Sequence, residues 1–141
     1  MKKTLLSAVV LLFMLANMPA KAVDMQAVKH ANPLPNFMIV FVKYGDMLDL
    51  SATQKQTLKK WGKEHKPVAQ KMVKAIMKGE KQLHQAAIDG ASKEEIMAQL
   101  DELLKARREL AALKTDCRDN LRQVLSDEQW NQVVDLYTEM P

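Results

Sequence analysis

The sequence is poor in the residues that build disulfide-linked, β-rich and nucleotide-binding folds. Cys117 is its one cysteine, so no intrachain disulfide can form. Its four glycines are far apart, which excludes the glycine-rich loops that cradle phosphate groups. With five prolines and 5% aromatic residues, it has too few turn and strand signals for a β-sandwich or barrel. Alanine, leucine, lysine, glutamate, glutamine and methionine dominate instead, and this composition predicts an all-α protein.

Residues 1–22 have the features of a secretory signal peptide. Lys2 and Lys3 precede an apolar run over residues 5–16, and Ala20-Lys21-Ala22 has the small-x-small pattern of a cleavage site. The run has about 12 residues, fewer than the roughly 20 that a membrane-spanning helix needs. We therefore expect cleavage after Ala22, a periplasmic location and no membrane anchor, since no cysteine at the end of the run could take a lipid.

The charge balance changes when this peptide is removed. The whole chain has a formal net charge of +4, but loss of the three lysines in residues 1–22 leaves +1. This small net charge removes the main reason to expect a nucleic-acid partner. The remaining charge is unevenly spread, with +7 on residues 51–88 and −5 on residues 89–141. Either the two regions attract each other as neighbouring helices, or the basic one offers a lysine-rich face to a partner.

Apolar residues at steps of three and four predict four helices. These span about residues 36–48, 52–88, 93–124 and 127–139. We interpret residues 23–35, which contain two prolines, as a flexible lead-in. Pro67 removes a backbone hydrogen bond from the second helix and should kink it. The expected fold class is all-α: one domain over residues 36–141, formed by a bent, long helical hairpin with short flanking helices.

Three capping boxes mark the expected helix starts. In such a box a serine side chain accepts a hydrogen bond from the backbone amide three residues later, and the glutamine or glutamate at that later position reaches back. The pairs are Ser51 with Gln54, Ser92 with Glu95, and Ser126 with Gln129. We assign these six residues a structural role as caps.

The third predicted helix carries a nearly regular apolar seam of the coiled-coil kind. Arg107 and Lys114 occupy two positions of this seam. A thin hairpin cannot bury both sides of its apolar stripes, because a chain of this size needs a compact shape to bury most of its surface. We therefore expect a homodimer in which a second copy covers this seam.

Few residues have the spacing of a catalytic or metal site. Cys117 with His65 or His84 is the only nucleophile-and-base set, and a thiol on an apolar stripe is usually inert, so we expect no enzymatic activity. His30, His65 and His84 form no i, i+4 pair, so we expect neither a metal site nor a cofactor. Cys117 stays open to three interpretations: an inert core thiol, an intermolecular disulfide, or a ligand of a soft ion such as Cu(I).

Methionines lie among the lysines of the second predicted helix. Methionine either fills irregular core space or forms an adaptable surface for varied, partly unfolded chains. Under the second interpretation, the lysines steer acidic segments and the apolar side chains hold apolar ones. The expected client-binding residues are Phe37, Met38, Phe41, Lys71, Met72, Lys74, Ile76, Met77 and Lys78.

Two five-residue segments add a family resemblance. Leu50-Ser51-Ala52-Thr53-Gln54 and Leu125-Ser126-Asp127-Glu128-Gln129 resemble the paired Leu-Thr-x-x-Gln motifs of the Spy/CpxP family of periplasmic stress proteins, with serine where the family usually has threonine. The order of the elements also matches, and the resemblance covers about residues 36–139. It implies a cradle-shaped homodimer of bent helical hairpins.

The resemblance also implies a function. Spy-like members are ATP-independent chaperones that bind unfolded or partly folded clients on the concave face. CpxP-like members modulate an envelope-stress sensor kinase, and other relatives bind zinc or nickel through histidines whose spacing is absent here. We therefore expect an ATP-independent periplasmic chaperone that binds unfolded client proteins in envelope stress. The alternative is a periplasmic regulator of a stress sensor kinase, or a metal-responsive binding protein.

Overall fold

The computed structural model describes residues 29–140, and within them every regular element is a helix. In chain order the elements are α2 (Met38–Tyr44), the short 3₁₀ helix η1 (Gly45–Met47), α3 (Ala52–Ile88), α4 (Lys93–Val124) and α5 (Asp127–Thr138). The predicted fold class, an all-α long hairpin with short flanking helices, is confirmed. The predicted signal peptide and residues 23–28 of the lead-in lie outside the described residues.

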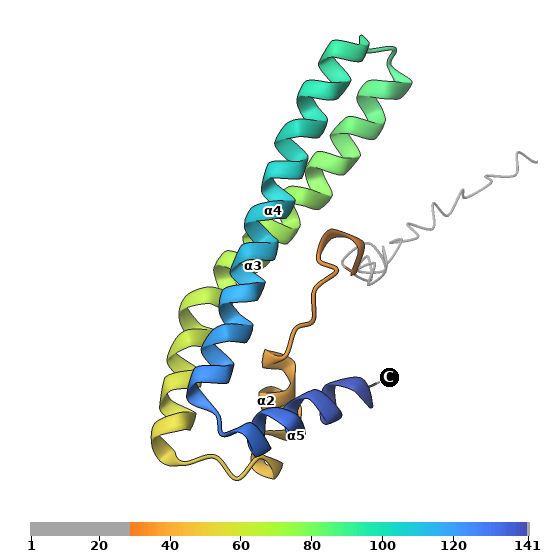
Figure 1. Cartoon of the computed structure of the whole chain (residues 1–141). Helices are drawn as coiled ribbons and strands as arrows, with labels where there is room; N and C mark the ends of the chain where they lie inside the picture. Colours follow the sequence, from red (N-terminus) through yellow and green to blue (C-terminus); the bar gives the residue numbers. More distant parts are fainter. Residues whose placement is uncertain (1–28, 141) are drawn as a thin grey trace, which may run out of the picture.

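The two long helices form an antiparallel hairpin. In Figure 1, α3 and α4 curve and cross along their length, so each lies on one side at the base and on the other side at the tip. The turn between them contains Gly90 at φ +79°, in the left-handed region that glycine adopts without steric cost. The shorter α2 and α5 pack beside the open end of the hairpin, on one side of it (Figure 1).

The starts of the long elements follow local sequence signals. Capping boxes begin α3 at Ser51, α4 at Ser92 and α5 at Ser126, as predicted. Only the first predicted helix differs: the backbone of Tyr44 leaves helical values at φ −132°, which separates α2 from η1. The helix α3 continues through Pro67, whose ring lies exposed.

Two separate groups of apolar side chains form the core. The base cluster joins α2, α3, α4 and α5 and contains the buried residues Val40, Leu48, Leu58, Leu121, Leu125 and Val133. The upper cluster lies further along the hairpin and contains Ala31, Ile76, Leu103 and Leu110. Ala31 is 1% exposed, so the segment 29–35, interpreted above as part of a flexible lead-in, contacts the hairpin at this residue. We call residues 29–35 the strap.

Candidate functional site

A pair of glutamines joins three helix ends at the base of the hairpin. Gln54 Nε2 donates to Gln129 Oε1 at 2.8 Å and to the carbonyl oxygen of Val124 at 2.8 Å. Gln129 Nε2 in turn donates to the carbonyl oxygens of Leu48 and Asp49, at 3.3 and 3.2 Å. The two capping glutamines therefore also bind each other, and they link the starts of α3 and α5 to the end of α4. Sequence reasoning assigned both as caps but missed this pairing.

A polar layer separates the base cluster from the upper cluster. Trp61 and His65 stack with ring centroids 3.7 Å apart, and His65 Nδ1 donates to the Trp61 carbonyl oxygen at 3.0 Å. Lys114 lies half-buried across from them, and burial lowers the pKa of its ammonium group. This layer explains why Lys114 interrupts an otherwise apolar seam.

Cys117 packs against the base cluster at the edge of this layer, near Trp61 and Lys114. Burial raises the pKa of its thiol, and the nearby indole N–H of Trp61 and the Lys114 ammonium lower it by less. The indole N–H itself has no hydrogen-bond partner among the described residues. At neutral pH the sulfur is therefore held as a thiol rather than as the thiolate that attacks disulfides or binds metal.

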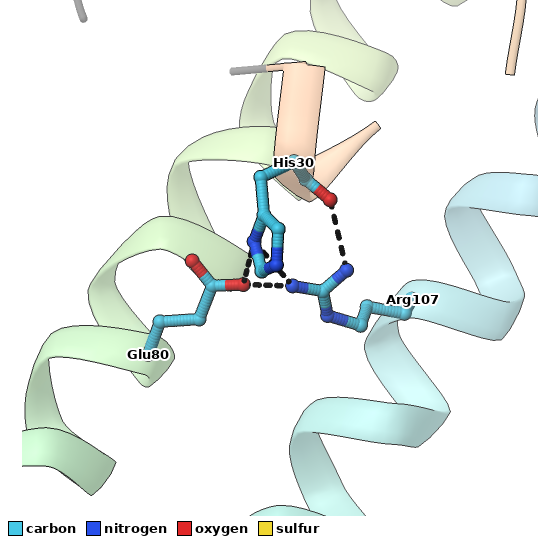
Figure 2. A network of polar contacts seen from close by, with 3 residues as sticks. All are labelled: His30, Glu80 and Arg107. Carbon is cyan, nitrogen blue, oxygen red and sulfur yellow. Dashed lines mark hydrogen bonds and ion pairs between the residues drawn. The ribbon is translucent and has the colours of Figure 1, made fainter. Parts of the chain in front are cut away.

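An ion-pair network holds the strap to the upper hairpin. Figure 2 shows Glu80 of α3 and Arg107 of α4 meeting beside His30. Arg107 Nη2 pairs with Glu80 Oε1 and donates to His30 Nδ1 at 3.1 Å, while Arg107 Nη1 donates to the His30 carbonyl oxygen at 3.0 Å. Arg107, the other polar residue of the seam besides Lys114, thus binds both the facing helix and the strap.

The expected client-binding residues do not form one surface. Phe37, Met38 and Phe41 are half-buried and pack against the base cluster, with Phe37 in aromatic contact with Trp130 and Tyr137. Met72 and Met77 are half-buried against the upper cluster, and Ile76 is fully buried within it. The expectation that Ile76 contacts a client is therefore wrong for this structure, because its side chain has no exposed surface.

The three lysines of the expected surface point another way. Lys74 and Lys78 each lie two positions from the buried Ile76, which places them on the opposite face of α3, and Lys71 is exposed with them. The lysines and the methionines therefore belong to different faces of the same helix.

Several large apolar side chains that sequence reasoning did not select are exposed. On the upper half of α4, Met97 is 45% and Leu104 is 52% exposed, with the half-buried Leu100 between them. The others are Leu34, Val42, Met47, Val68 and Ile88. The signal in the sequence was the Leu103-Leu104 pair, because only one of two adjacent leucines can face α3.

The hairpin also has two edges of opposite charge. The lysine edge of α3 consists of the exposed Lys71, Lys74, Lys78 and Lys81, continued before Pro67 by Lys60 and Lys63. The carboxylate edge of α4 consists of the exposed Glu94, Asp101, Glu109, Asp116 and Asp119. Asp101 and Asp119 each lie two positions from a buried leucine, so this edge faces away from α3.

These two edges form no direct ion pairs with each other among the described residues. Within residues 29–140, the ion pair that joins the two long helices is Glu80 with Arg107, an acid on the basic helix and a base on the acidic one. Among the described residues, no lysine of α3 forms a close ion pair with a carboxylate of α4, so the opposite net charges do not act through direct pairs.

The described surface offers shallow cavities rather than a deep site. One of about 260 Å³ lies between the strap and α4, beside Arg107, Arg108 and Leu110. Another of about 460 Å³ lies near the tip and is lined by Gln82, Gln85, Ala86, Asp89 and Gln99. Residues 29–140 contain no group of three or more His, Cys, Asp or Glu side chains that could hold a metal ion. None of the described helices has the length and apolarity to cross a bilayer.

Comparison with known proteins adds no assignment. No family model, curated protein or solved structure matches the chain. The resemblance to the Spy/CpxP family therefore rests on the two motif segments and the order of the helices.

Proposed function

We propose that this protein is an ATP-independent chaperone that binds unfolded or partly folded proteins. The observation that carries the proposal is the exposure of large apolar side chains on a thin helical hairpin, above all Met97 and Leu104 on α4. Exposed apolar side chains set among charged ones are typical of surfaces that bind other chains. Because the nearby cavities are shallow, the surface suits extended segments of varied sequence better than one small ligand.

The client surface we propose is the apolar row of Met97, Leu100 and Leu104. Their spacing of three and four residues places them on one face of α4, and Arg108 continues the row toward the strap. Apolar client side chains would pack on the row, and carboxylates of the client would pair with Arg108. This replaces Ile76 as the apolar centre of the surface, while Met77 keeps a half-exposed position on α3.

Suppression of aggregation tests the proposal directly. A reduced, denatured client is diluted with and without an equimolar amount of the protein, in the absence of ATP, and light scattering is followed. We expect the protein to slow aggregation, and the double variant Met97→Gln, Leu104→Gln to lose most of this effect. The matched control is Ala98→Gln with Ala112→Gln, two exposed positions on the same helix. No suppression by the wild type, or equal suppression by both double variants, would contradict the proposal.

Location and assembly belong to the same proposal. Residues 1–22 support export to the periplasm, where an ATP-independent mechanism is required because ATP is absent. A homodimer would extend the client surface, with a second copy covering the exposed Val68 and the half-buried Trp61, which lie seven residues apart on one face of α3. Cell fractionation and the mass of the exported chain test the first inference, and sedimentation of the purified protein tests the second.

A further inference from the structure

The lysine edge is a run of closely spaced like charges along α3. Lys71, Lys74, Lys78 and Lys81 follow one another at steps of three and four, and all are exposed. None forms an ion pair among the described residues. Lys60 and Lys63 extend the row, so it runs for roughly 30 Å along α3 at 1.5 Å per residue. The only acids of α3 are Glu64, within the row, and Glu80, which is turned toward Arg107.

The composition of the edge indicates what it recognises. It contains lysine alone, and α3 has no arginine. Lysine acts as a compact, strongly hydrated point charge, without the planar fork by which arginine grips one carboxylate or phosphate. Trp61 lies between Lys60 and Lys63 in the sequence, but it is half-buried and stacks on His65, and no aromatic residue lies between Lys71 and Lys81. The edge therefore offers few stacking platforms for nucleic-acid bases. It also lacks the apolar centre of a protein–protein interface. Such an edge suits a partner whose negative charges are spread over an extended surface rather than gathered in one group.

We propose that the lysine edge docks on a membrane surface rich in anionic phospholipid headgroups. A row of lysines along one face of a helix can meet a flat array of phosphates, each lysine near such a surface adding about fivefold in affinity. The carboxylate edge lies on the far side of α4, roughly 20 Å away for two packed helices. This separation exceeds the screening length of about 8 Å at physiological salt, so the carboxylates do not oppose the contact.

The geometry favours a flat surface over other polyanions. A nucleic acid that bends around the hairpin would meet the carboxylate edge, whereas a bilayer touches one edge only. Contact through the lysine edge leaves Met97 and Leu104 on α4 away from the lipid, since they lie on the other helix. The docked protein would therefore still present its proposed client surface. The proposal does not depend on chaperone activity, because the lipid contact uses a different set of side chains.

Co-sedimentation with vesicles tests the inference. The protein purified after export is mixed with vesicles of phosphatidylcholine alone, or of phosphatidylcholine with phosphatidylglycerol. We expect binding to the anionic vesicles only, and loss of binding as salt is raised. The test variant carries Lys71→Gln, Lys74→Gln, Lys78→Gln and Lys81→Gln, which keeps strong helix formers at exposed positions. Its affinity should fall on the order of several hundredfold, at about fivefold for each lysine.

A second variant separates the edge from the net charge. Lys43→Gln, Lys55→Gln, Lys93→Gln and Lys105→Gln remove the same charge from exposed positions off the edge. We expect it to keep the wild-type affinity within severalfold. Circular dichroism of both variants should match the wild type, so that lost binding reports the edge rather than unfolding.

Three outcomes would overturn the proposal. The first is equal binding to neutral and anionic vesicles, and the second is an equal loss in the two lysine variants. The third is evidence of another partner for the edge. This would be binding of single-stranded DNA as tight as binding to the anionic vesicles, or salt-sensitive self-association that is lost in the edge variant and kept in the control variant. Aggregation assays on the edge variant show separately whether client binding survives.

Discussion

The base of the hairpin and its upper half are built from the same two helices but are stabilised differently. At the base, side chains from α2, α3, α4 and α5 surround one apolar cluster, and the glutamine pair ties three helix ends together. In the upper half, α3 and α4 pack only on each other and on the strap, whose buried anchor is Ala31. The base therefore carries most of the stability, and the upper half leaves apolar surface exposed.

This difference indicates how the fold combines a stable core with an adhesive surface. A two-helix layer buries one stripe of each helix and leaves the flanking positions in solvent. The exposed Ile88, Met97 and Leu104 all lie in the upper half, where neither short helix packs over the hairpin. These side chains are exposed because only two helices pack together in the upper half. Only another chain could cover them.

Truncating one buried leucine in each region should give the largest difference. Leu121→Ala removes a side chain of the base cluster, which is fixed from several helices and cannot collapse around the cavity. We expect a loss of about 3–5 kcal/mol in the free energy of unfolding, against about 2–3 kcal/mol for Leu110→Ala in the upper cluster. Equilibrium urea denaturation measures both. Equal losses would show that the upper half is packed as rigidly as the base.

The glutamine pair should give the next largest effect. Gln129→Ala removes one partner of the half-buried Gln54 amide and the side-chain donor to the carbonyls of Leu48 and Asp49, which should cost about 2 kcal/mol. Glu95→Ala removes the matching contact at the exposed tip and should cost clearly less, because water replaces the lost hydrogen bonds there. The double variant Gln54→Ala, Gln129→Ala should lose clearly less than the sum of the single losses. Additive losses would mean that the two caps act independently.

Loss of the strap contact should have a smaller effect, confined to the upper half. Arg107→Met keeps the apolar stem but removes the bonds to Glu80 and His30. We expect about 0.5–1.5 kcal/mol of destabilisation and faster hydrogen exchange at the amides of Ala31 and Asn32. The control is Arg118→Met, whose exposed partner is the adjacent Asp119 and whose loss should cost about 0.5 kcal/mol at most. Unchanged exchange in the strap would show that Ala31 alone holds it.

The sequence predicted the helices closely because their boundaries depend on local signals. The serine caps and the left-handed Gly90 act within one turn of the chain, so α3 and α4 begin and end where the pattern placed them. The pairing of Gln54 with Gln129 joins residues 75 positions apart and has no local signal. The burial of Ala31 is equally non-local, since alanine in a proline-containing segment gives no sign that it docks.

The candidate site was predicted less well because charge and residue type were counted along the chain rather than around the helix. Lys74, Ile76 and Met77 are neighbours in sequence, but they are exposed, buried and half-buried respectively. Net charge per region likewise did not show that the lysine and carboxylate edges face away from each other. Angular position around each helix decided both outcomes.

Acid should produce the smallest effect and should distinguish the tip from the base. The capping residue at the start of α4 is Glu95, whose pKa is lowered because its carboxylate accepts hydrogen bonds from the backbone and side chain of Ser92. The folded pKa lies below the unfolded value near 4.5, so the cap stabilises the helix above that pH and loses this effect as pH falls through the folded value. Gln54, at the same position in α3, does not titrate.

We therefore expect the first turn of α4 to exchange its amides faster as pH falls below about 4.5, after correction for intrinsic exchange, while the first turn of α3 does not change. Glu95→Gln should remove the pH dependence at α4. Glu128 also has a lowered pKa, through hydrogen bonds with its own backbone and with the Ser126 side chain, so α5 should respond to acid although its capping residue is Gln129. An equal response at all three helix starts would mean that acid loosens the whole fold rather than these carboxylate caps.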